Sequence, residues 1–98
     1  MDKYIILVNS GVYNSSAIDK SCVIGRSANV FSREEVDLIF NDWTGGEVMV
    51  DEDGEEVSID DLIDVGDCGE RINIVNEEMV AMSDVGGWVE VSILKLDM

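Results

Sequence analysis

The chain has 98 residues with 22 Asp and Glu against six Lys and Arg, no His and no Pro, and a formal net charge of −16. This length predicts a single domain over residues 1–98, and 46% hydrophobic content predicts a folded core rather than an acidic disordered tail. The charge opposes direct binding to nucleic acid or to an anionic membrane. Without histidine, a zinc site lacks one of its usual ligands. Serine and cysteine nucleophiles likewise lack their usual base.

Residues 3–9 form the first predicted element, a buried strand that ends at Ser10 and Gly11. Residues 12–13 and 21–24 are expected to form two short strands on either side of a polar turn at residues 14–16. The longest apolar run, residues 4–8, is too short to cross a membrane or to be the core of a signal peptide. We therefore expect a cytoplasmic protein that makes no membrane contact.

The two cysteines, Cys22 and Cys68, lack the spacing of a metal site. In a reducing cytosol we expect two free thiols, mostly buried, and a single disulfide is the open alternative.

Residues 32–43 are predicted to form an amphipathic helix. Ser32 followed by Glu35 is the pattern of a capping box, in which each side chain bonds the backbone amide of the other residue. Gly45 and Gly46 are expected to stop the helix. Apolar residues then recur at the helical spacing that makes one buried stripe, namely Val36, Ile39, Phe40 and Trp43.

Residues 47–59 are predicted to form a β-hairpin. Asp53 and Gly54 suit the two central positions of a type I′ turn. Pairing outward from that turn sets Val50 opposite Val57 and places carboxylates opposite carboxylates at the tip. Because like charges in opposed positions destabilise a hairpin, this tip is a poor choice for stability alone.

The remaining elements complete an antiparallel sheet. Ser58 and Asp61 predict the start of a short second helix, about residues 60–65, that Gly66 ends. Residues 71–75 and 88–96 read as strands, and a third strand is expected around residues 79–82. Trp88, at the start of the last strand, fits a core and an interface equally well. The predicted fold class is α+β.

The most informative feature is the distribution of the acidic residues. Residues 34–70 contain fifteen carboxylates and no Lys or Arg, whereas residues 1–33 sum to +2 and residues 71–98 to −3. Such a block repels itself, so its retention indicates a function. The alternative is a solvated face that serves solubility or adaptation to high salt, although salt adaptation would spread the acids over the whole surface.

Neither a metal site nor an enzyme is expected. Residues 51–54 suggest a calcium loop, but the register that puts Gly54 at the sixth position of an EF-hand puts Met49 at the first. No phosphate-binding glycine motif is present, and 22 carboxylates make a close carboxylate pair inevitable and therefore uninformative. We expect no catalysis, no metal and no cofactor.

A chain that is small, free of histidine and rich in clustered Asp and Glu resembles the DNA-mimic proteins of bacteriophages and mobile elements, among them anti-restriction and anti-CRISPR inhibitors. The resemblance implies an inhibitor that occupies the nucleic-acid groove of a basic protein such as a restriction nuclease or a CRISPR effector. Carboxylates repeat every ~6–7 Å along one face of a strand and every ~5–6 Å on a helix, which is comparable with the phosphate spacing of DNA.

Two alternatives stay open beside this one. The chain is also similar to the acidic immunity proteins that neutralise nuclease toxins, and it could be an acidic protein-interaction module. Self-association into a dimer is open as well, since two acidic faces could imitate a longer duplex. In each case we expect the partner to meet one surface, formed by Glu34, Asp37, Asp42, Glu47, Asp51, Glu52, Asp53, Glu55, Glu56, Asp60, Asp61, Asp64 and Asp67.

Overall fold

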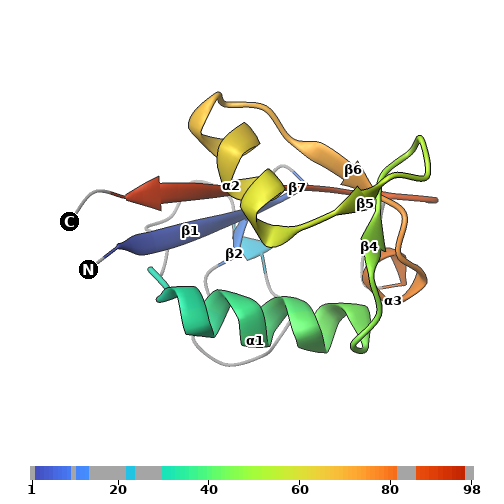
Figure 1. Cartoon of the computed structure of the whole chain (residues 1–98), viewed down its shortest axis with the longest axis horizontal. Helices are drawn as coiled ribbons and strands as arrows, with labels where there is room; N and C mark the ends of the chain where they lie inside the picture. The colour runs from blue at the N-terminus through green and yellow to red at the C-terminus, as the bar shows by residue number, and fades with distance from the viewer. Residues whose placement is uncertain (1, 10, 14–21, 24–29, 82–85, 97–98) are drawn as a thin grey trace.

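An antiparallel sheet lies at the centre of the computed structural model, which describes residues 2–9, 11–13, 22–23, 30–81 and 86–96 (Figure 1). Within these residues the sheet has five strands in the order β3-β2-β1-β7-β6. They are β1 (Lys3–Val8), β2 (Gly11–Tyr13), β3 (Cys22–Val23), β6 (Ile72–Ile74) and β7 (Val89–Leu96). These positions confirm, within the described residues, the strands predicted at residues 3–9, 12–13, 21–24, 71–75 and 88–96, while the turn predicted at residues 14–16 lies outside the described residues.

The first helix, α1 (Arg33–Thr44), agrees with its prediction at both ends. Ser32 is its N-cap: the Ser32 hydroxyl accepts from the Glu35 amide at 3.2 Å, and a Glu35 carboxylate oxygen accepts from the Ser32 amide at 3.0 Å. The helix ends at Gly45. All four residues of the predicted stripe are buried, and the ring of Phe40 meets that of Trp43 edge-on with centroids 5.0 Å apart.

The predicted hairpin forms, but its register was predicted one residue out. Strand β4 (Met49–Val50) pairs with β5 (Glu56–Val57), so that Met49 rather than Val50 lies opposite Val57. The loop between the two strands has three residues. Its turn is closed by a hydrogen bond from the Gly54 amide to the Asp51 carbonyl at 3.0 Å, and Gly54 adopts a φ of 80°. A one-residue shift exchanges the two faces of a strand, so Met49 is buried and Val48 is exposed.

The second helix, α2 (Ile59–Asp67), is longer than predicted. Its N-terminal capping box of Ser58 and Asp61 is confirmed, but Gly66 lies inside the helix instead of ending it. A β-carbon on Gly66 would lie 2.0 Å from the carbonyl oxygen of Ile93 in β7. The glycine therefore serves the close approach of a helix to a strand, a role that the sequence pattern does not distinguish from a helix end.

The strand predicted around residues 79–82 is wrong where the structure describes it. Residues 77–80 form the short helix α3 (Glu77–Val80). Its N-cap Asn76 accepts hydrogen bonds from the amides of Glu78 and Met79 at 3.0 and 3.2 Å. A capping side chain outweighs the weak strand preference of so short an apolar segment.

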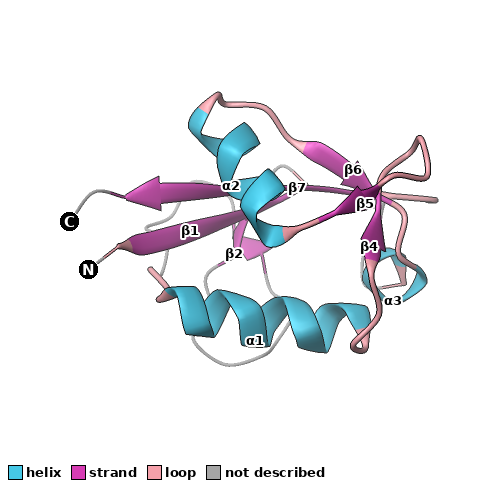
Figure 2. Cartoon of the chain, in the orientation of Figure 1, coloured by secondary structure: helices cyan, strands magenta, loops and turns pink. Residues whose placement is uncertain are grey.

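One hydrophobic core joins the sheet to the helices and the hairpin around it. Figure 2 shows how these elements are arranged. Tyr4, Ile6 and Val8 alternate with half-buried residues along β1, and Ile6 pairs with Ile93. This sheet face packs with buried side chains from α1, the hairpin, α2 and α3. The predicted α+β class with an antiparallel sheet and a single domain is thereby confirmed.

Candidate partner-binding surface

The acidic segment forms a distinct part of the structure. Helix α1, the β4–β5 hairpin and α2, residues 33–67, turn most of their apolar side chains toward the core and their carboxylates toward solvent. We call these three elements the acidic layer. In Figure 1 the tip of the hairpin projects at one end of the molecule, whereas β1 begins and β7 ends at the other.

Nine of the thirteen predicted contact residues are exposed carboxylates whose side chains have no hydrogen bond or ion pair with any described residue. Three come from α1 or the connection after it, four from the hairpin and two from α2. They are Glu34, Asp42, Glu47, Glu52, Asp53, Glu55, Glu56, Asp64 and Asp67. Within the described part of the chain, Asp67 feels a longer-range attraction to Lys95, and no ion pair neutralises any member of the set.

Two of the thirteen share one ion-pair partner, Arg33, which the sequence places one residue before the acidic run. Its guanidinium contacts Asp37 Oδ1, one turn further along α1, at 2.5 Å and Asp60 Oδ1, in α2, at 3.3 Å. Arg33 thus ties α1 to the start of α2. Asp37 and Asp60 remain exposed, but part of their charge is already compensated.

The last two predicted residues, Asp51 and Asp61, have structural roles. The Asp51 carboxylate accepts hydrogen bonds from the amides of Asp53 at 2.9 Å and Glu55 at 3.0 Å, which holds the hairpin loop closed. Asp61 accepts from the Ser58 amide at 2.9 Å in its capping box. These two carboxylates are expected to contribute less to a partner than the nine unpaired ones.

Glu35 does not belong to the predicted set, but among the carboxylates of the acidic layer its pKa is the one that is clearly shifted. Its pKa is lowered from 4.5 because the Ser32 backbone amide, and then the Ser32 side chain, hydrogen-bond to it and favour the charged form. Glu35 therefore stays ionised at neutral pH as a helix cap.

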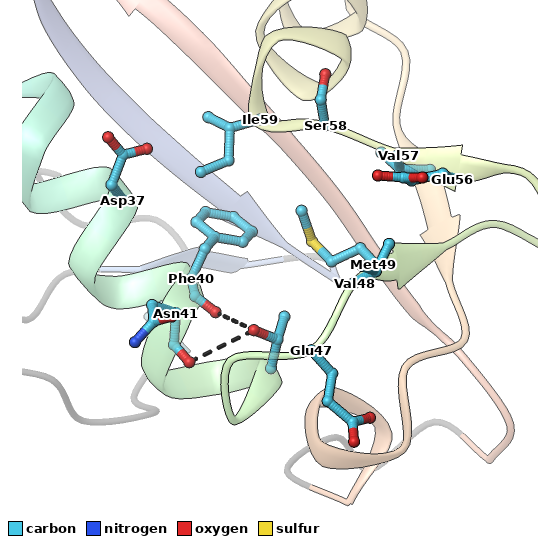
Figure 3. A pocket seen from close by; sticks show the side chains of 11 residues that line it. Asp37, Phe40, Asn41, Glu47, Val48, Met49, Glu56, Val57, Ser58 and Ile59 are labelled. Carbon is cyan, nitrogen blue, oxygen red and sulfur yellow. Dashed lines mark hydrogen bonds between the residues drawn. The ribbon is translucent and has the colours of Figure 1, made fainter.

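A groove lies between α1 and the hairpin (Figure 3). Its volume is about 270 Å³. Phe40, Met49 and Ile59 converge on its middle, with Asp37 on the helix side and Glu56 on the strand side. The Glu47 side chain also lines the groove, but its carboxylate points toward α3. The groove thus combines an apolar floor with an acidic rim.

Two aliphatic side chains interrupt the acidic surface, and the sequence analysis missed both. Leu38 of α1 is 60% exposed and Val48 beside β4 is 58% exposed. Leu38 lines a shallow hollow with Asp37 and Asn41, and both of these residues also line the groove that Val48 borders. The signal for Leu38 was present in the helical spacing, because residue 38 falls outside the buried stripe.

Neither cysteine extends this site. Cys68, just after α2, is free and exposed, so the expectation of a buried thiol is wrong for this residue. The side chain of Cys22 lies outside the described part of the structure. Trp88 is exposed at the start of β7 and is not in the hydrophobic core.

Searches for a metal site and for a membrane span give negative results. No group of three or more His, Cys, Asp or Glu side chains among the described residues could hold a metal ion. Within the same residues no helix has the length and hydropathy to span a membrane. Comparison of the chain with models of protein families, with characterised proteins and with solved structures found no significant match.

Proposed function

We propose that this protein is a non-catalytic inhibitor that binds a basic, nucleic-acid-handling protein and blocks its nucleic-acid site. The target class is a restriction nuclease or a CRISPR effector, whose lysines and arginines are arranged to neutralise phosphates. The acidic layer occupies that site in place of the DNA backbone. The protein therefore needs neither a cofactor nor a reactive group of its own.

One observation carries this proposal: nine exposed carboxylates of the acidic layer make no hydrogen bond or ion pair within the described structure. Unpaired charges of one sign lower the stability of the free protein by repelling one another. A cationic partner relieves that repulsion and forms charge-assisted hydrogen bonds, which are stronger than bonds between neutral groups. Long-range attraction also raises the rate of encounter.

The primary experiment is capture of partners from a lysate of the natural host by the tagged protein, with elution by a salt gradient. A C-terminal tag follows β7, whose end lies away from the hairpin tip (Figure 1). We expect a basic nuclease or CRISPR effector that duplex DNA displaces. With about six carboxylate contacts, affinity should fall by roughly 10³-fold or more between low and physiological salt, as it does for phosphate contacts. Partners that resist salt and ignore DNA would refute the proposal.

The hairpin provides the matched variants. Replacement of Glu52, Asp53 and Glu56 by Lys reverses three unpaired charges and leaves the Asp51 cap in place. A control with Glu70, Glu77 and Glu78 changed to Lys alters the net charge equally outside the acidic layer. We expect only the hairpin variant to lose inhibition. Equal loss in both would indicate a response to net charge alone. A secreted nuclease toxin as the captured partner would instead identify the immunity-protein alternative.

A further inference from the structure

The groove between α1 and the hairpin has the size and lining of a site for one long side chain. Its volume of about 270 Å³ lies below the ~300–1,000 Å³ usual for small-molecule pockets. Met49 and Ile59 offer apolar contact in the middle, and exposed Val48 extends that contact to the surface. Asp37 and Glu56 stand on opposite sides of the opening (Figure 3).

The chain itself shows how this surface holds a guanidinium. Arg33 uses two nitrogens to bridge carboxylates of different helices, Nη1 to Asp37 and Nη2 to Asp60. Asp37 contributes only Oδ1 to that bridge, and its Oδ2 accepts no hydrogen bond from a described residue. Glu56 is fully without a partner there. The groove therefore offers a guanidinium carboxylate oxygens without a described partner on both of its walls.

We infer that the groove receives an arginine side chain of the partner protein. The inference rests on the proposed function and names the group that the acidic layer recognises. The methylenes of the arginine lie on Met49, Ile59 and Val48, while its guanidinium meets the Glu56 carboxylate at the rim. Arginine fits better than lysine because its planar fork bonds both oxygens of one carboxylate at once and is less strongly hydrated.

The test uses n-butylguanidinium, which is the arginine side chain together with its α-carbon, titrated into the ¹⁵N-labelled protein and followed by NMR. We expect saturable shifts at the amides of residues 37–44 and 48–59. Guanidinium ion, which lacks the apolar stem, and n-butylammonium, which lacks the fork, should each bind at least about threefold more weakly. Two results would overturn the inference. One is chemical-shift changes of similar size near every exposed carboxylate, and the other is equal affinity for the three probes.

Two matched amide variants test which carboxylate binds the n-butylguanidinium probe. Glu56→Gln keeps the shape of a groove residue and should weaken n-butylguanidinium about threefold to tenfold. Asp64→Asn removes the same charge from an exposed carboxylate of α2 outside the groove and should change affinity less than about twofold. Equal weakening by the two variants would contradict a site in the groove.

This titration and the capture experiment fail independently. If the probe does not localise to the groove but a DNA-displaceable nuclease is captured, the inference is wrong and the proposed function stands. If the probe binds the groove but no nucleic-acid-handling protein is recovered, the site stands and the proposed function is wrong.

Discussion

The carbonyl oxygen of Ile93 lies 2.0 Å from the position that a β-carbon would take on Gly66. Strand β6 pairs with β7 only as far as Val91. Helix α2 packs against the next part of β7, and only glycine permits this approach. The contact joins the acidic layer to the sheet, so the stability of the domain depends on the absence of a β-carbon at Gly66.

Gly66→Ala is therefore expected to destabilise the protein by about 2–4 kcal/mol. This loss would occur although alanine favours a helix over glycine by ~1 kcal/mol. Urea unfolding followed by circular dichroism measures it. Gly86→Ala is the control, because Gly86 has open space around its Cα, and its effect should stay within about 0.5 kcal/mol. An unchanged midpoint for Gly66→Ala would contradict the packing described.

The hairpin loop provides the second prediction. Asp51→Ala removes the acceptor for the amides of Asp53 and Glu55 and should cost about 1 kcal/mol. Asp51→Asn keeps a side-chain oxygen in the same place and removes a charge from a crowded acidic tip, so its effect should stay within about 0.5 kcal/mol. Chemical denaturation of the two variants distinguishes them. Equal losses would mean that the charge, not the cap, matters.

The capping box of α1 makes a prediction about pH. The folded pKa of Glu35 lies below 4.5, so its contribution to stability is complete above the unfolded pKa and is lost as pH falls through the folded pKa. Glu35→Gln keeps an acceptor but removes the charge. The free-energy difference between wild type and this variant should be constant near neutral pH and shrink in acid. A free-energy difference that grows as pH falls would mean that folding raises the pKa of Glu35 instead of lowering it.

The unpaired carboxylates predict that salt stabilises the free protein. Sodium chloride screens the repulsion between carboxylates that lie farther apart than the Debye length, which is ~8 Å at physiological ionic strength. We expect a gain of about 1 kcal/mol, or roughly 4–8 °C in Tm, between very low and physiological salt. The Lys variant at Glu52, Asp53 and Glu56 should show a smaller salt effect, measurable by calorimetry. A Tm that falls with added salt would mean that attractive pairs dominate.

Local patterns predicted the elements that local interactions determine. The Ser32–Glu35 box and the apolar stripe fixed α1 closely, because both act within a few residues along one helix. The hairpin register was harder to predict, since it depends on the Asp51 side chain closing a three-residue loop instead of on matching apolar pairs. Similarly, Asn76 selected a helix where composition favoured a strand.

The composition of the site was predictable, but its internal pairing was not. The exposure of nine carboxylates follows from their charge. The bridge from Arg33 to Asp60 spans 27 positions, and no spacing rule relates the two residues. The groove likewise depends on how α1 and the hairpin pack together, which places Phe40 near Met49 and Ile59. These relationships belong to the tertiary structure alone.

The location of the acidic layer gives the molecule a permanent electric dipole. Most of the negative charge of the chain comes from residues 34–70, so the dipole points from this layer toward the rest of the protein. Near a cationic surface such a molecule rotates before it touches. More of its collisions therefore begin with α1 and the hairpin facing the surface, and the correct orientation is selected during approach rather than after contact.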